Sequence, residues 1–261
     1  MASLQGRTAL VTGVSRSVGI GTAIARRLAA DGAALYLTGW PGHDAEQPWG
    51  EDAGGAERLV DELRRSGAQV ELAHADLSRP RAPYELVQAA TARFGRVDVL
   101  VANHARSAEQ SLAELTEAEL DLCFAVNARA TLMLVRHFAE QHPGGPGGRV
   151  VTFTSGQYHG AMPAELPYIA SKAVLQQLTA SLAVELAPRR ITVNCVDPGP
   201  NDTGYAGAEL HRRVEEAALM GRWGRPEDAA RLVAWLCSDD ADWVTGQTIA
   251  SDGGWSARGG P

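Results

Sequence analysis

Short apolar runs alternate with longer amphipathic stretches along the whole chain. Seven runs, each close to glycine or polar turn residues, are typical of buried strands and cover residues 7–13, 33–39, 69–77, 97–105, 149–155, 190–199 and 246–254. Apolar residues at helical spacing predict helices over 21–32, 56–67, 84–95, 116–141, 166–187 and 226–238. Continuous apolar strands joined by helices are typical of a parallel sheet covered on both faces. The pattern therefore predicts one α/β domain over residues 1–261, with a doubly wound parallel sheet of about seven strands.

The segment 40–55 interrupts this alternation. It reads WPGHDAEQPWGEDAGG and is the one long irregular connection that the pattern predicts. Loops of this length inside compact domains are usually functional or mobile. The sequence leaves its role open.

Composition narrows the class of protein. Hydrophobic residues make up 45% of the 261 residues, and the formal net charge is -7. With no arginine cluster and no apolar run of about 18 residues, neither nucleic acid nor a membrane is an expected partner. The N-terminus lacks the pattern of a signal peptide, so a soluble, cytoplasmic protein is expected. Cys123, Cys195 and Cys237 lie far apart without metal-ligand spacing, which suits a reducing compartment and predicts no metal site.

A glycine-rich turn, TGVSRSVGIG, follows the first predicted strand. Gly13 permits a tight turn, Gly19 leaves room for phosphates, and Gly21 lets the next helix approach the sheet. The helix N-terminus then favours an anion, and Ser15 can donate a hydrogen bond. The turn predicts a Rossmann-like dinucleotide site, in which the adjacent Ile20 also contacts the cofactor. The alternative is a tight strand-to-helix turn without a ligand.

Two features bear on the choice of cofactor. An acid at the end of the second strand would bond the adenosine ribose and repel a 2′-phosphate. That end reads Leu37-Thr38-Gly39-Trp40, with no acid before Asp44. Arg16 in the glycine turn could instead meet a 2′-phosphate. NADP(H) is therefore preferred and NAD(H) is possible; the alternative for Arg16 is a solvated loop residue.

Lys172 is the only lysine in the chain, which otherwise uses arginine. It lies four residues after Tyr168, so the two side chains share a face of the predicted helix. Ser155 closes the fifth predicted strand, at the sheet edge where such folds hold ligands. The three groups can converge there. The alternative is that Tyr168 and Lys172 are neighbours on the helix surface without a role in catalysis.

A nearby ammonium can change the chemistry of a phenol. A tyrosine has a pKa of about 10, and moving it to about 7 or 8 requires roughly 3–4 kcal/mol. A cation about 4 Å away at an effective dielectric of about 20 supplies roughly 4 kcal/mol. We therefore expect Lys172 to lower the pKa of Tyr168, using a compact charge that the planar fork of arginine does not provide.

These motifs resemble the short-chain dehydrogenase/reductases over almost the whole chain, in particular members like the 3-oxoacyl-ACP reductases. TGVSRSVGIG is similar to the cofactor loop of that family, HADLS to its adenine-contacting segment, VANHA to its NAG motif, and YIASK to its YxxxK motif. The DPGPNDT segment is similar to PGxxxT, and the last third also resembles the family. By this resemblance the expected cofactor residues, besides those of the glycine turn, are Asp76, Leu77, Asn103, Tyr168, Lys172, Pro198, Gly199 and Thr203.

The resemblance implies an NADP(H)-dependent oxidoreductase that interconverts a carbonyl and a secondary alcohol of a small molecule. Tyr168 would exchange the proton, Lys172 would lower its pKa and hold the ribose, and Ser155 would bond the substrate oxygen. Asn127 would position a water that relays protons; its alternative is an Asn bonded to nearby backbone. Residues 200–220 occupy the place of the substrate lid. A homo-oligomer, tetramer or dimer, is expected through the helices over 116–141 and 166–187.

Departures from the family pattern leave other functions open. Five residues separate Gly13 from Gly19, where the family usually has three. After Asn103 the family usually has small residues that leave the backbone open beside the cofactor, whereas this chain has His104. His104 either lines the site or makes a local hydrogen bond. The same fold also supports non-redox dehydration or epimerisation, and non-catalytic dinucleotide sensing; the latter usually loses the tyrosine or the lysine.

Overall fold

All seven predicted strands are present in the computed structural model, which describes residues 3–145 and 147–258. They are β1 (Thr8–Thr12), β2 (Ala34–Gly39), β3 (Val70–His74), β4 (Val99–Ala102), β5 (Gly148–Phe153), β6 (Ile191–Asp197) and β7 (Thr248–Ala250). They pair in parallel in the order β3-β2-β1-β4-β5-β6-β7. The direction of winding reverses between β1 and β4, and open α/β sheets bind ligands at the carboxyl ends of the strands beside such a point.

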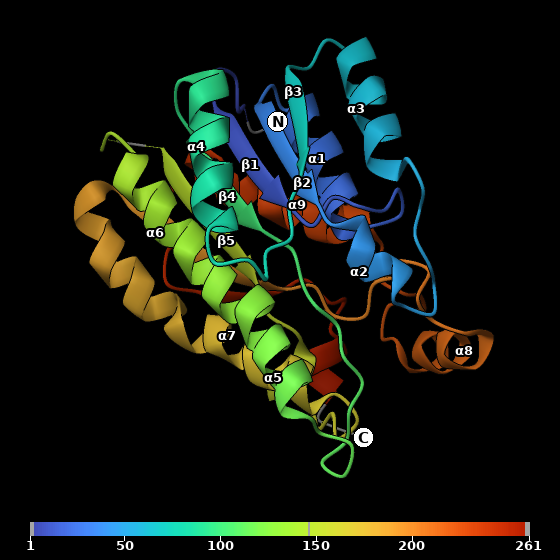
Figure 1. Ribbon diagram of the computed structural model, residues 1–261. Coiled ribbons are helices and arrows are strands. Elements are labelled where there is room, and N and C mark those ends of the chain that lie inside the picture. Colours follow the sequence, from blue (N-terminus) through green and yellow to red (C-terminus); the bar gives the residue numbers. More distant parts are fainter. Residues whose placement is uncertain (1–2, 146, 259–261) are drawn as a thin grey trace.

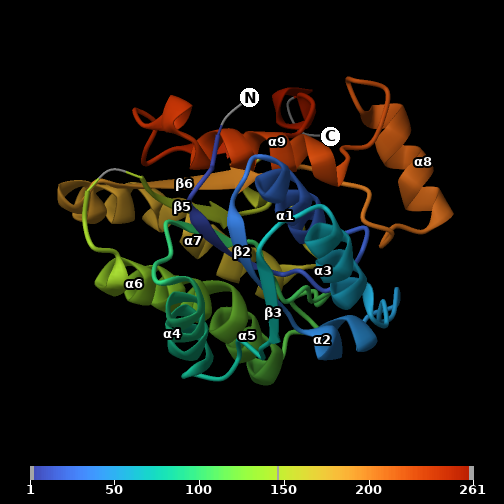
Figure 2. The ribbon, with the colours of Figure 1, turned by 90° about the horizontal axis from the view of Figure 1, so that it is seen from above.

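Helices cover both faces of the sheet, as predicted (Figure 1). The longer ones are α1 (Ile20–Ala30), α3 (Gly55–Arg65), α4 (Ala82–Phe94), α6 (Thr131–Gln141), α7 (Leu166–Leu186), α8 (Ala208–Ala217) and α9 (Pro226–Cys237). Figure 2 shows α1, α3 and α9 on one side of the sheet, with α4, α6 and α7 on the other. The fold is the predicted doubly wound, Rossmann-like arrangement.

Alternation along the strands divides the core between these two layers. Val11 belongs to the buried cluster that includes Ile24 of α1, whereas its neighbour Leu10 belongs to the cluster that includes Phe138 of α6. Successive strand side chains point to opposite faces, so a sheet covered on both sides needs an apolar residue at nearly every position. Each fully buried side chain of this size contributes about 1.5–3 kcal/mol to folding.

The predicted helix over 116–141 is continuous in direction but changes its winding. It consists of α5 (Glu117–Cys123), a π-helical stretch at Phe124–Ala130, and α6. Thr116 Oγ1 accepts a hydrogen bond from the Glu119 N–H at 3.3 Å. The Glu119 carboxylate pairs with Arg106, so it does not complete the reciprocal cap that the sequence suggests.

Two helices, one of five residues and one of ten, lie in segments where the sequence predicts none. The segment 40–55 begins with α2 (Pro41–Ala45), whose first position is occupied by a proline, and 200–220 contains α8. The segment 40–55 is therefore only partly irregular. None of the helices in the described ranges combines the length and the apolar character that crossing a bilayer requires.

Candidate functional site

The glycine turn after β1 is held in place by Asn103. The Asn103 Nδ2 group donates to the carbonyl oxygens of Thr12 and Gly13, both at 3.1 Å. Gly13 has φ +74°, a left-handed conformation that suits glycine. A Cβ atom at Gly21 would lie 2.3 Å from the Gly13 carbonyl oxygen, so the close approach of α1 to β1 requires glycine there.

The first turn of α1 is open to an anion. Gly19 is its N-cap and makes no side-chain cap hydrogen bond. The leading N–H groups of a helix lack intrahelical acceptors and carry partial positive charge. The nearest obstacles to a methyl group at Gly19 are atoms of Arg16, at 3.2 Å or more. This donor set fits the pyrophosphate of a dinucleotide.

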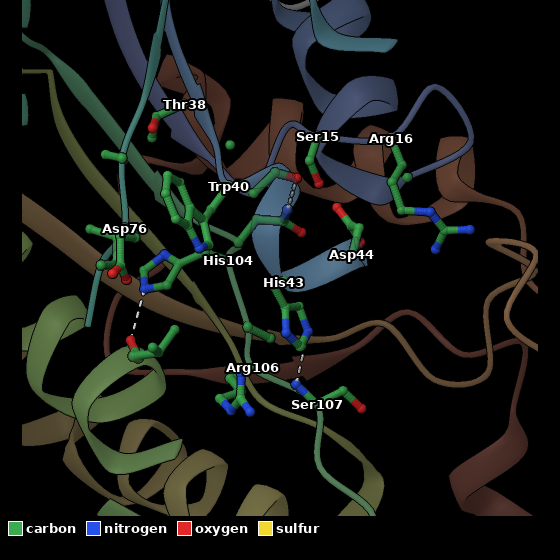
Figure 3. A pocket seen from close by; sticks show the side chains of 18 of the residues that line it. Ser15, Arg16, Thr38, Trp40, His43, Asp44, Asp76, His104, Arg106 and Ser107 are labelled. Carbon is green, nitrogen blue, oxygen red and sulfur yellow. Dashed lines mark hydrogen bonds between the residues drawn. The ribbon is translucent and has the colours of Figure 1, made fainter. Parts of the chain in front are cut away.

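A cleft of about 360 Å³ opens beside this helix end (Figure 3). Most of the predicted cofactor residues line it together: Gly13, Ser15, Arg16, Gly19, Ile20, Asp76, Leu77, Asn103 and Thr203. The remaining predicted residues, Pro198, Gly199, Ser155, Asn127, Tyr168 and Lys172, do not form part of this lining. The structure therefore divides the predicted site into a nucleotide cleft and a separate cluster of polar groups.

The segment 40–55 supplies a wall of the cleft that sequence reasoning did not assign. Trp40, His43, Asp44, Glu46 and Trp49 line it. Figure 3 shows Asp44 near Ser15 of the glycine turn and His43 directed toward Ser107. The length of this segment was the only signal available, and it did not indicate which side chains point inward.

Arg106 ties that wall to the opposite side of the cleft. Its guanidinium binds the Glu119 carboxylate with two hydrogen bonds, of 2.6 and 2.9 Å, and Glu46 at 3.1 Å. The carboxylates raise the pKa of Arg106, led by the hydrogen bond to Glu119. Ser107 N–H also donates to His43 Nε2 at 3.4 Å (Figure 3).

The sequence left open whether His104 lines the site or makes a local hydrogen bond. The structure shows the hydrogen bonds, and His104 also borders the cleft. Its Nδ1 lies 2.7 Å from Thr12 Oγ1, and its Nε2 lies 3.0 Å from the Val126 carbonyl oxygen. Burial, followed by the charge of Lys172, lowers the pKa of His104 to about 3. The ring is therefore neutral near pH 7 and bridges β1 to the π-helical stretch.

Ser155 and Tyr168 meet at the carboxyl end of β5. Ser155 follows that strand and Tyr168 lies in the first turn of α7. Burial raises the pKa of the Tyr168 phenol, while a hydrogen bond with the Ser155 side chain lowers it; the charges of Glu165 and Asp197 raise it further. The net direction is upward, so the phenol holds its proton at neutral pH.

Lys172 is buried, with 2% of its surface exposed. Its Nζ donates to the Phe153 carbonyl oxygen at 3.0 Å and lies 6.0 Å from the centre of the Tyr168 ring. Burial lowers the pKa of this amine to about 8. The expected lowering of the Tyr168 pKa is thus wrong for this geometry, because the desolvation of the phenol outweighs an ammonium that is directed at a carbonyl group.

Asn127 is fully buried in the π-helical stretch. Its Oδ1 accepts from Arg106 N–H at 2.7 Å, and its Nδ2 donates to the Arg106 carbonyl oxygen at 3.0 Å and to Ser171 Oγ at 2.8 Å. These are the bonds of the backbone-bonded alternative. The side chain joins the segment after β4 to the helix that carries Tyr168 and Lys172.

The segment 200–220 reaches both parts of the site. Thr203 lines the nucleotide cleft, and a Cβ atom at Gly204 would lie 3.5 Å from the Arg16 guanidinium. Electrostatic coupling with the Tyr205 phenol is among the causes that raise the Tyr168 pKa, which places the two phenols near each other. Gly199, just before the segment, has φ +60°, and a Cβ atom there would clash with Asp252.

Comparison with known proteins agrees with this geometry. The family model described as Enoyl-(Acyl carrier protein) reductase matches residues 13–256. The chain is 38% identical to the uncharacterized oxidoreductase YjdA of Bacillus subtilis, over 97% of this chain and 98% of the relative. It is 34% identical to a short-chain dehydrogenase from Burkholderia cenocepacia solved in complex with NADP, with a TM-score of 0.86 and coverage of 97% and 98%.

A second similar structure is a blue fluorescent protein from a metagenomic library in complex with NADPH, at 33% identity, a TM-score of 0.86 and coverage of 97% and 99%. The fold, the family model and these full-length similarities agree. The chain belongs to the short-chain dehydrogenase/reductase family of oxidoreductases.

Proposed function

We propose that this protein is an NADP(H)-dependent oxidoreductase that interconverts a carbonyl and a secondary alcohol by hydride transfer. The observation that carries the proposal is the hydrogen bond between Ser155 and Tyr168 beside the buried Lys172. This cluster lies at the carboxyl edge of the sheet that also carries the nucleotide cleft, where such folds bind ligands.

In the proposed reaction Tyr168 exchanges the proton. Its raised pKa keeps the phenol protonated at neutral pH, which is the form that donates to a carbonyl oxygen during reduction. Ser155 would bond the same oxygen as negative charge develops there. NADP(H), when bound, supplies or accepts the hydride.

Lys172 and Asn127 support these groups. The Lys172 ammonium has three donors, and among the residues that the structure describes only the Phe153 carbonyl accepts from it, so the other donors remain for hydroxyl groups of a bound ribose. Asn127 acts as a positioning residue, since its amide bonds Arg106 and Ser171 on either side of the cluster.

NADP(H) rather than NAD(H) is supported by charge at the nucleotide cleft. Arg16 lines it, and β2 ends at Gly39, followed by Trp40, without an acid. The NADP and NADPH complexes of the similar structures agree with this choice. Asp44 lines the same cleft from α2 and is a carboxylate that NAD(H) would tolerate better.

The proposal places one catalytic domain over residues 1–261, with 200–220 as the substrate lid. Tyr205 near Tyr168 supports the lid. The apolar helix α7 leaves Val184 77% exposed, which supports a homo-oligomer through α7 and the α5–α6 helix. Three buried free cysteines fit a reducing cytoplasm.

Turnover with a panel of ketones and secondary alcohols tests the proposal, with reduced nicotinamide followed by absorbance. Wild-type protein should oxidise NADPH with at least one ketone class. Tyr168→Phe removes only the phenolic oxygen and should lower the turnover rate about 10²- to 10⁴-fold while dinucleotide affinity remains. Product formation without any change in the cofactor would favour the non-redox alternative. NADPH binding without turnover on any member of the panel would favour the sensor.

A further inference from the structure

The Arg16 guanidinium lines the nucleotide cleft without a carboxylate partner. No ion pair or hydrogen bond joins its guanidinium to another residue within 3–145 and 147–258. It lies over the ring of Trp49, with its central carbon 5.3 Å from the ring centre. A cation that is held against an aromatic face and lacks a counter-ion is suited to receive an anion.

Trp49 is itself fixed on two sides. Its Nε1 donates to Asp44 Oδ1 at 3.2 Å. Its ring and that of Tyr205 pack edge to face, with the ring centres 6.4 Å apart and an angle of 73° between the ring planes. Asp44 is buried in α2, and Tyr205 comes from the segment 200–220. The indole therefore joins two segments that flank the Arg16 side chain.

The far end of the segment 40–55 is anchored beside Arg16. The Ser17 N–H donates to Asp52 Oδ2 at 2.7 Å, and Arg58 also binds the Asp52 carboxylate. The hydrogen bond of the Ser17 side chain, followed by that of the Ser17 N–H, lowers the pKa of Asp52. The segment is thus tied to the residue that follows Arg16, which limits how far Trp49 can move relative to the guanidinium.

Further polar atoms in the same cleft lack partners. Thr38 Oγ1 and His43 Nδ1 are buried and have no hydrogen-bond partner in the described part of the chain, and both residues line the cleft. Thr38 is 1% exposed. Because Ser107 N–H donates to His43 Nε2, a neutral His43 carries its proton on Nδ1 and can donate from there. A ligand with hydroxyl and phosphate oxygens would satisfy these atoms.

We infer that Trp49 is a positioning residue that sets the coenzyme preference by holding Arg16 for the 2′-phosphate of NADP(H). The inference rests on the proposed function and deepens it. It assigns the segment 40–55 to recognition of the phosphorylated ribose. Asp44 has two opposing effects there: it holds Trp49 through a hydrogen bond, and its charge repels the phosphate.

Dissociation constants of NADPH and NADH, measured by the fluorescence of the bound nicotinamide, test the inference. Trp49→Ala should weaken NADPH about 3- to 30-fold with little effect on NADH, the range expected for a cation–π contact. Trp49→Phe keeps an aromatic face and should retain most of the preference. Asp44→Asn keeps an acceptor for the indole but removes the charge, so it should strengthen NADPH relative to NADH.

Trp243→Ala is the matched control, since Trp243 is 98% exposed and is not among the residues that line the cleft. It should leave the NADPH-to-NADH ratio unchanged. Equal weakening of both nucleotides by Trp49→Ala, or no gain for NADPH in Asp44→Asn, would overturn the inference and leave the proposed function intact. If wild-type protein bound neither nucleotide, the proposed function would fail, and the inference with it.

Discussion

The Lys172 ammonium donates a hydrogen bond of 3.0 Å to the Phe153 carbonyl oxygen, at the carboxyl end of β5. This bond holds the amine of the only lysine at the edge of the sheet, 6.0 Å from the centre of the Tyr168 ring. Burial makes its positive charge costly and lowers the pKa of the amine to about 8. The charge on which the proposed chemistry depends is therefore lost within an accessible pH range.

A high-pH limb in the activity profile follows from that pKa. The ammonium is fully present well below pH 8 and disappears as the pH rises through this value. We expect kcat/KM to fall across this range, because neutral Lys172 no longer attracts developing negative charge. Lys172→Arg stays charged to above pH 12, so it should lack this limb while being slower at neutral pH. A wild-type profile that stays flat between about pH 7 and pH 10 contradicts this role for Lys172.

His104 makes the fold sensitive to acid. Its folded pKa is about 3, whereas an unfolded histidine titrates near 6.5, so only the unfolded chain gains a proton between these values. Stability should therefore fall as the pH drops below 6.5, by about 2 kcal/mol at pH 5. Denaturant unfolding of wild-type protein and of His104→Asn, each at about pH 6.5 and about pH 5, measures this contribution to the free energy of unfolding. An identical pH dependence in the two proteins would show that the buried ring plays no part.

Asn127 should matter for stability as well as for activity. Asn127→Ala leaves the Arg106 N–H without its acceptor and removes the donor to Ser171 Oγ. An unsatisfied buried group costs about 1–3 kcal/mol, so the free energy of unfolding should fall by at least this amount. Thermal and denaturant unfolding check the value. Full stability with lost activity would instead favour the water relay.

An exposed apolar position on α7 tests the oligomeric state. Val184 is 77% exposed on a helix that is apolar on most sides. Analytical ultracentrifugation should find a homo-oligomer for wild-type protein and a smaller species for Val184→Glu, since a buried unpaired carboxylate is costly. Val184→Ala is the matched control and should keep the assembly. A monomeric wild-type protein would disprove the expectation.

Sequence patterns predicted the sheet because the physics there is local. A strand that is buried on both faces must be apolar at nearly every position, so a run such as Val99–Ala102 stands out. The glycine turn was equally clear, because Gly13 adopts a left-handed backbone conformation and Gly21 allows α1 to approach β1 closely. These residues also located the nucleotide cleft.

The electrostatics could not be predicted from spacing. Tyr168 and Lys172 lie four residues apart as expected, but the sequence does not reveal that burial dominates both pKa values or that the ammonium bonds a carbonyl group. The wall formed by Trp40, His43 and Asp44 was missed because its contacts depend on partners distant in the chain, such as Arg106. The helices α2 and α8 are short or strongly polar, and tertiary context decides whether such segments fold.

Transfer of deuterium from the cofactor to the product is the decisive test that this protein catalyses hydride transfer to a carbonyl. Wild-type protein is supplied with NADPH deuterated at C4 of the nicotinamide and with a ketone that it reduces, and the alcohol is analysed by mass spectrometry. With deuterium at both C4 positions, we expect deuterium on the carbinol carbon in amounts equal to the NADPH consumed, and almost none with Tyr168→Phe. Alcohol that carries no deuterium from either face of the ring, or undiminished transfer by Tyr168→Phe, would contradict it.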